Sequence, residues 1–280
     1  MEMTLIVVAL LAAAAGLVVV AASVLRWVAA HRKDLLSAAR RASDRLRMQR
    51  VAGLIVWLRP PWLFGMSAVL GLVVVTAAAV GAGTLMQDVT DGDGVAVLDH
   101  PVAGFVAGHR TGALTMVMRA ASTAGGPVVL GAVTVAVGVV LGIIWRSWGP
   151  VLVAGVTVAG NGVLTLALKE AVARPRPPIS GALAAADGYA FPSGHAATAA
   201  AAFGVLAFLC AGPLRSWAAR VTIWAGVAML ATLVGISRIY LGVHWATDVF
   251  GGWACGALWL AVVVTVSTVL AHGRGGWKSS

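Results

Sequence analysis

The chain contains 280 residues, of which 60% are hydrophobic and only 11% are charged. Soluble domains carry about a quarter charged residues, so this composition excludes an ordinary soluble enzyme, a disordered chain and a disulfide-stapled secreted domain. The formal net charge of +10 is typical either of a nucleic-acid-binding protein or of a membrane protein with a basic cytoplasmic face. The distribution of the 20 Lys and Arg residues along the chain decides between these two classes.

Seven apolar stretches approach the roughly 20 residues that a membrane-spanning helix needs. They predict an all-α fold, a polytopic bundle of membrane helices. The sixth stretch is short, but Ser237, Arg238 and the residues after them extend it. The first has the alternative interpretation of a signal peptide, although it is long for one and lacks a basic leader. The stretches are 3–25, 64–85, 127–145, 150–168, 196–212, 221–236 and 249–271.

Two of the connections between these stretches are long. Residues 26–59 are typical of a basic amphipathic helix that lies on the anionic cytoplasmic leaflet, and a docking site for a partner or nucleic acid is the alternative. Residues 86–126 begin with an acidic, glycine-rich turn at 87–93 and continue as a mildly amphipathic segment around 100–122. No Glu follows at the offset that a calcium loop requires, so we expect a solvated turn on the outer face.

Charge distinguishes the two sides of the membrane. When the connections are assigned alternately to two sides, fourteen Lys and Arg fall on one side and six on the other. The acidic residues divide in the opposite sense, two against eight. The positive-inside rule places the side with fourteen cations in the cytoplasm, so the N-terminus is expected outside and the C-terminus inside. Topology thus explains the net charge, and we expect no nucleic-acid partner.

Polar side chains from three distant stretches are predicted to meet at the outer face. Such residues are costly near a bilayer, so their clustering is informative. Lys169 and Arg176 lie two helical turns apart, and Arg238 offers a planar fork for phosphate oxygens. Each stretch alone also has a structural explanation: headgroup anchoring, a capped helix or a bracing ion pair. The stretches are 169–177, 191–195 and 237–248.

Two of these stretches carry groups suited to catalysis. Ser193 and Gly194 precede the fifth span, where free N–H groups at a helix N-terminus bind anions and His195 can donate a proton. His244 and Asp248 are four residues apart, so on a helix they share a face. A carboxylate on one imidazole nitrogen makes the other a nucleophile. The combination predicts phosphoryl transfer, and the lack of a carboxylate cluster predicts that no metal takes part.

The three motifs together resemble the signature of the type 2 phosphatidic acid phosphatases, which are grouped with vanadium-dependent haloperoxidases and bacterial acid phosphatases. The pattern Lys-x6-Arg-Pro, Pro-Ser-Gly-His and Ser-Arg-x5-His-x3-Asp is complete in this chain. The resemblance covers residues 61–280, which would form a six-span phosphatase core. Residues 1–60 would then form an N-terminal span followed by the basic helix.

The resemblance implies a role for each motif residue. His244 would attack the phosphorus and form a phosphohistidine, and Asp248 would orient it. His195 would protonate the leaving group and then activate water. The residues that would hold the phosphoryl oxygens are Lys169, Arg176, Ser193, Gly194 and Arg238, with Arg176 chosen over Arg174 by its spacing from Lys169. No cofactor is implied.

These expectations converge on a membrane phosphatase that hydrolyses a phosphomonoester or pyrophosphate of a lipid, either phosphatidate-type or undecaprenyl diphosphate, at the outer leaflet. The alternatives are a vanadate-dependent haloperoxidase and a non-catalytic protein that binds or transports lipid phosphates. The Ala, Val and Gly bias suggests a bacterial source and therefore a bacterial cell membrane. The expected partners are the lipid substrate and the bilayer, and a homodimer is left open.

Overall fold

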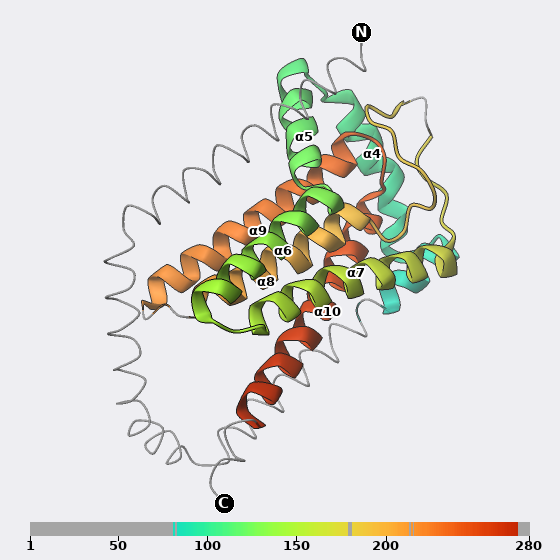
Figure 1. Ribbon diagram of the computed structural model, residues 1–280. Helices are drawn as coiled ribbons and strands as arrows, with labels where there is room; N and C mark the ends of the chain where they lie inside the picture. The colour runs from blue at the N-terminus through green and yellow to red at the C-terminus, as the bar shows by residue number, and fades with distance from the viewer. Residues whose placement is uncertain (1–80, 82, 179–180, 213, 215, 274–280) are drawn as a thin grey trace, which may run out of the picture. The chain divides into compact units, whose positions relative to one another are not determined.

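The computed structural model describes residues 81, 83–178, 181–212, 214 and 216–273, all of which belong to the unit Val73–Ser280. These residues form helices and connecting turns without strands, which confirms the all-α class (Figure 1). The predicted span at 3–25 and the predicted basic helix at 26–59 lie outside the described residues, as does most of the predicted span at 64–85.

Five of the described helices are long and apolar enough to cross a membrane. The helix α9 ends at Tyr240 and therefore includes the predicted extension through Arg238. The helix α7 continues to Val172, beyond the predicted end at 168, because hydropathy marks the apolar part of a span and not its polar last turn. The five are α6 (Pro127–Trp145), α7 (Gly149–Val172), α8 (Gly194–Ala211), α9 (Trp217–Tyr240) and α10 (Ala246–Gly273).

The local sequence ends α7 and starts α8 on either side of a long loop. Ala173 has a left-handed φ of 49°, and its N–H donates to the Lys169 carbonyl, which closes the last turn of α7. Pro175 follows and cannot continue the helix. Extended backbone at Ser193 precedes Gly194, the first residue of α8. The loop between them folds back on itself, since the Ala190 N–H donates to the Arg174 carbonyl at 2.8 Å.

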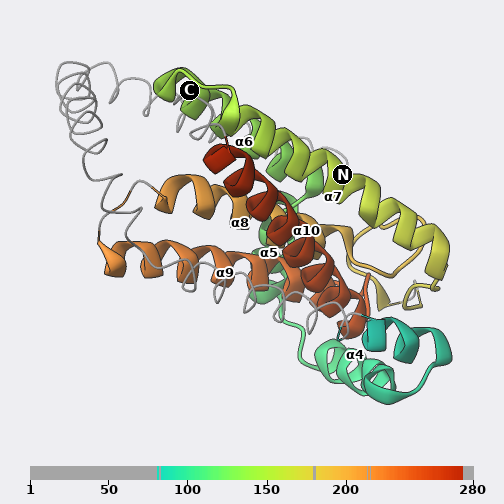
Figure 2. The same cartoon turned by 90° about the horizontal axis from the view of Figure 1, so that it is seen from below.

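The helix α8 is the centre of the bundle. It packs against α6, α7, α9 and α10, and Figures 1 and 2 both show it among these helices. In its most apolar window 61% of the residues are buried inside the protein, against 17–28% in the other four long helices. The outer helices therefore present most of their apolar surface to lipid, whereas α8 is enclosed by protein.

Two glycines of α10 allow its backbone to approach α8 closely. A Cβ on Gly252 would lie 2.6 Å from the Ser193 carbonyl oxygen, and a Cβ on Gly256 would lie 2.2 Å from that of Ala197. Small residues at such interfaces let membrane helices pack backbone against backbone. The contact continues to the ends of both helices, where the Ser193 N–H donates to the Asp248 carbonyl at 2.8 Å.

The segment before α6 is more helical than predicted. Residues 83–91 are helical, so the expected turn at 87–93 is restricted to its last residues. The Asp88 carboxylate accepts the Val95 N–H at 3.0 Å and so joins this helical segment to the start of the next helix, Gly94–Leu98. The amphipathic segment consists of two helices, separated where Thr111 caps the second one. The elements are η1 (Gly94–Leu98), α4 (Asp99–Gly108) and α5 (Gly112–Ala124).

The close contact of α8 and α10 predicts that Gly256→Ala is destabilising. The added methyl group overlaps the backbone of α8, and overpacking of this kind costs about 1–3 kcal/mol. Gly226→Ala is the matched control, because a Cβ at Gly226 on α9 meets open space. Thermal unfolding in detergent should show a lower midpoint for Gly256→Ala alone. Equal midpoints for both variants would contradict the packing described for α10.

Candidate active site

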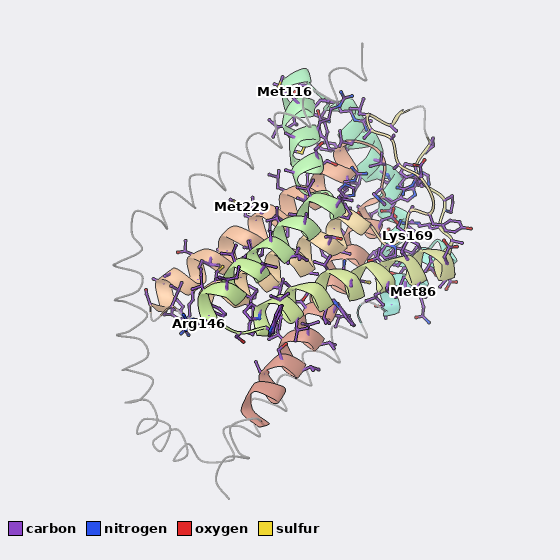
Figure 3. All side chains as sticks on the ribbon, in the orientation of Figure 1. Met86, Met116, Arg146, Lys169 and Met229 are labelled. Atoms are coloured by element: carbon purple, nitrogen blue, oxygen red, sulfur yellow. The ribbon has the colours of Figure 1, made fainter. Side chains whose placement is uncertain are left out.

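The residues predicted to meet do lie at the same end of the bundle. The last turn of α7, the start of α8, the end of α9 and the start of α10 all reach this end. Figure 3 shows Lys169 here, close to the loop that follows α7, and Arg146 at the opposite end of the helices. Four side chains at this end are close enough to His195 to interact with it electrostatically, namely Arg238, His244, Arg176 and Lys169.

His244 and Asp248 are held together by a turn and not by one helix face. The helix α10 begins at Ala246, so His244 precedes it and Asp248 lies in its first turn. The Asp248 carboxylate accepts the Trp245 N–H at 2.8 Å, and its Oδ2 lies 3.4 Å from His244 Nδ1. The expectation of a shared helix is therefore wrong, because the carboxylate caps the helix start and meets the imidazole there. The two side chains are almost fully buried.

Arg176 faces the other nitrogen of the same imidazole. Its Nη1 lies 3.2 Å from His244 Nε2 and also donates to the Val243 carbonyl at 2.8 Å. A guanidinium has no acceptor, so this contact needs a lone pair on Nε2. The proton of the neutral ring then belongs on Nδ1, toward Asp248. The remaining contacts of Arg176 are with the carbonyls of Asp187 and Gly188, which fix the guanidinium at the site.

Burial keeps the imidazole of His244 neutral at physiological pH. Desolvation lowers its pKa to about 4, and the neighbouring Asp248 carboxylate offsets part of that effect. Desolvation also lowers the pKa of Arg176, but an arginine stays protonated at neutral pH. The site thus presents an unprotonated Nε2 next to fixed positive charge, the arrangement that an anionic electrophile requires.

The start of α8 offers donors to an anion. Ser193 is fully buried, and its Oγ has no hydrogen-bond partner among the described residues. Ser193 is the N-cap residue of α8 by position, but its side chain makes no capping hydrogen bond. The Nε of Arg238 is likewise buried without a partner in the described part of the chain. Buried donors are nearly always paired, so these two groups suit a ligand with several oxygens.

The two remaining cations of the first motif differ in position. Lys169 donates to the Tyr189 carbonyl and interacts electrostatically with Arg176, Asp248 and Arg238. Arg174 instead pairs with Asp248 at 2.6 Å, on the side of the carboxylate away from the imidazole contact. The structure thus places Arg176, and not Arg174, against His244. Arg238 is anchored from α5, because its Nη1 donates to the Ser122 hydroxyl.

One buried carboxylate at this end escaped the sequence analysis. Asp99, the first residue of α4, is 2% exposed and forms an ion pair with Arg174 at 2.7 Å. In the sequence Asp99 is a single acidic residue between two apolar runs, a pattern that is also typical of a solvated surface carboxylate. A cavity of about 260 Å³ opens beside the site between α4 and the end of α9. Its lining includes His100, Arg110, Pro178, Gly242, His244 and Trp245.

Comparison with known proteins connects this geometry to one family. The family model of the PAP2 superfamily matches residues 150–270. Phosphatidylglycerophosphatase B of Bacillus subtilis (strain 168) is 42% identical over 99 residues, which are 34% of this chain and 47% of that protein. Undecaprenyl-diphosphatase of Sulfolobus acidocaldarius is 36% identical over 73 residues, 26% of this chain and 31% of that protein. The chain thus spans about half or less of the curated relatives it matches.

A solved structure extends the similarity beyond the matched segment. The crystal structure of a transmembrane PAP2 type phosphatidylglycerolphosphate phosphatase from Bacillus subtilis superposes with a TM-score of 0.62 at 27% identity. The superposition covers 68% of this chain and 96% of that one. The membrane bundle and the resemblance drawn from the three motifs are both confirmed. Residues 150–270 thus match the PAP2 superfamily in sequence, and the fold around them is similar to that of a transmembrane PAP2 type phosphatase.

Proposed function

We propose that this protein is a membrane phosphatase that removes a phosphoryl group from a lipid phosphate or diphosphate. The observation that carries the proposal is the neutral His244, held between Asp248 and Arg176 and surrounded by cations and unpaired donors. The names of the relatives agree with it, since one is a phosphatidylglycerophosphatase and another an undecaprenyl-diphosphatase. Five candidate spans place the site in a membrane protein, where lipid substrates are at hand.

The first step transfers the phosphoryl group to His244. The Nε2 lone pair is released when Arg176 turns to the phosphoryl oxygens. It then attacks phosphorus while the bond to the lipid-side oxygen breaks, and Asp248 stabilises the positive charge that develops on the ring. His195 gives its proton to the departing oxygen. The equatorial oxygens carry the negative charge of the transition state. Their partners are Lys169, Arg176, Arg238, the Ser193 hydroxyl and the N–H groups at Gly194 and beyond.

The second step returns the enzyme to its starting state. His195, now neutral, accepts a proton from water as the water oxygen attacks phosphorus. The P–N bond breaks, its electrons return to Nε2 of His244, and inorganic phosphate leaves. The same cations serve both steps, because both transition states carry charge on the same three oxygens. Fixed cations and helix dipoles act here without reorganisation, which is why they stabilise the transition state more than bulk water does.

The proposed orientation places the site on the extracytoplasmic face of a bacterial cell membrane. Its support is the excess of Lys and Arg on the opposite side, to which Arg146 and Arg220 belong among the described residues. The N-terminus is then outside and the C-terminus in the cytoplasm. The acidic residues of 88–99 lie on the side of the site, in agreement with the same rule.

Replacement of the nucleophile is expected to abolish phosphate release. His244→Ala should lower kcat/KM by at least about 1,000-fold on phosphatidate, phosphatidylglycerophosphate and undecaprenyl diphosphate, because the variant lacks the imidazole that would accept the phosphoryl group. The measurement is inorganic phosphate released by purified protein in mixed micelles. His109→Ala is the control, since His109 is exposed and bonds only locally, to the Phe105 carbonyl. Full activity of His244→Ala would refute the mechanism.

The acid limb of the pH–rate profile should fall near pH 4. His244 has a pKa of about 4, below the ordinary value of 6.5, so its reactive neutral form persists until the pH falls through that range. The unfolded chain binds this proton at its ordinary pKa, so folding stability also decreases as pH falls from about 6.5 toward 4.

Initial rates of kcat/KM against pH, with folded protein checked at each pH, provide the measurement. A phosphomonoester and a diphosphate lipid are compared, and a limb common to both belongs to the enzyme. A common limb at about pH 6.5 would show that His244 titrates as an exposed histidine, contrary to its burial.

A further inference from the structure

A buried chain of charges runs from α4 to the His244–Asp248 pair. The carboxylate of Asp99 accepts three contacts: Arg174 Nη2 at 2.7 Å, the Thr247 N–H at 3.0 Å and the Thr247 hydroxyl at 2.5 Å. Asp99 and Thr247 are almost fully buried, and Asp248 is completely so. A carboxylate placed in such surroundings needs a partner that compensates its charge.

Arg174 is the central member of this chain. Its Nη1 donates to Asp248 Oδ1 at 2.6 Å and to the Thr247 hydroxyl at 2.8 Å, while its Nη2 holds Asp99. The guanidinium also lies over the ring of Trp245, 5.8 Å from the ring centroid. A planar fork with several donors can join two carboxylates in one plane, which a lysine ammonium cannot do. Arg174 therefore connects α4 to the first turn of α10.

We propose that Asp99 and Arg174 are positioning residues that hold Asp248 in the orientation and charge state that His244 requires; the catalytic part of this inference rests on the proposed function. Neither residue contacts His244. Arg174 binds Oδ1 of Asp248 and the Trp245 N–H binds Oδ2, so the carboxylate plane is fixed with Oδ2 toward His244 Nδ1. A rotated carboxylate would leave the imidazole without its orienting partner.

Asp99 balances the charge of Arg174. Arg174 pairs with both Asp99 and Asp248, so its single positive charge is divided between two carboxylates. Asp248 is therefore only partly neutralised and can still interact with the imidazole. Without Asp99, the full positive charge of Arg174 would act on Asp248 alone, and at 2.6 Å that charge is large in a buried site. Asp248 would then stabilise the positive ring in the transition state less well. The segment before residue 150, outside the region that matches the family, thus contributes to the site.

A purely structural role is the alternative. A buried ion pair is weak evidence for stability by itself, and the chain of contacts would then only fasten α4 to the bundle. The two roles differ in their effect on folded protein. Loss of a purely structural contact lowers the stability of the fold. Loss of a positioning contact slows the chemical step and changes the tautomer of His244 even when the protein is folded.

Asp99→Asn is the primary test, because it removes the charge and keeps the size. We expect kcat to fall about 10- to 100-fold with KM nearly unchanged, since misplacement of a catalytic group slows the chemistry and Asp99 does not contact the phosphate. Asp91→Asn is the matched control, because it removes the same charge from an exposed position before α4. Rates are normalised to folded protein, so a loss of stability alone leaves kcat unchanged.

A spectroscopic measurement provides a readout without turnover. Nitrogen-15 NMR of labelled histidine at pH 7 reports the tautomer of His244, assigned by its loss in His244→Ala. The wild-type protein should show the Nδ1–H tautomer, and Asp99→Asn should show a mixture with Nε2–H. Arg174→Lys is the second variant in case Asp99→Asn does not fold. It keeps the charge but cannot hold both carboxylates, so the same kcat loss and tautomer mixture are expected.

The outcomes distinguish this inference from the proposed function. If the wild-type enzyme is active and the folded variants keep its kcat and its His244 tautomer, the inference is overturned and the proposed phosphatase function stands. If the wild-type protein releases no phosphate but Asp99→Asn still changes the tautomer of His244, the positioning role is supported and the proposed phosphatase function is overturned. A shifted KM with unchanged kcat would place Asp99 in substrate binding and would also overturn the inference.

Discussion

The close contact of α8 and α10 is the constraint on which the site depends. Gly252 and Gly256 allow the two backbones to touch, so the N-termini of both helices lie side by side. One hydrogen bond, from the Ser193 N–H to the Asp248 carbonyl, then joins the second motif to the third. The start of α8, which is proposed to bind the phosphoryl group, and the Asp248 carboxylate beside His244 thus have a fixed separation. A side chain at either glycine would move one of these groups relative to the other.

Burial explains why the groups in the site are arranged as they are. Charges near a bilayer are costly, and each carboxylate here is matched by a cation or by N–H donors. Desolvation keeps His244 neutral with a pKa of about 4, so the proposed nucleophile has a free imidazole lone pair without a strong base beside it. The cations that remain after this pairing have donors to spare, such as Nε of Arg238. A phosphoryl group would supply the acceptors that the described protein groups do not.

The sequence predicted the five described spans well, because the hydropathy of a span is local information. Hydropathy located α6 to the residue, and the motif spacing selected Arg176, which the structure places against His244. Local information failed where contacts join distant segments. The buried position of Asp99 depends on Arg174 and Thr247, which lie far from it in the chain. The turn that holds His244 before α10 was missed for another reason, because the spacing of His244 and Asp248 does not mark where the helix begins. An isolated Asp gives no sign that an arginine 75 residues away will bury it.

The central claim is that Nε2 of His244 becomes phosphorylated, since Nδ1 faces Asp248 and Nε2 faces the cations. The direct measurement is rapid acid-free quenching of the enzyme with phosphorus-32-labelled lipid, followed by peptide mapping and phosphorus NMR of the labelled histidine. The proposed mechanism predicts an acid-labile, base-stable phosphate on Nε2 of His244 that is chased into inorganic phosphate at the rate of turnover. A phosphate on Nδ1 or on another residue, or turnover without any phosphoenzyme, would contradict it.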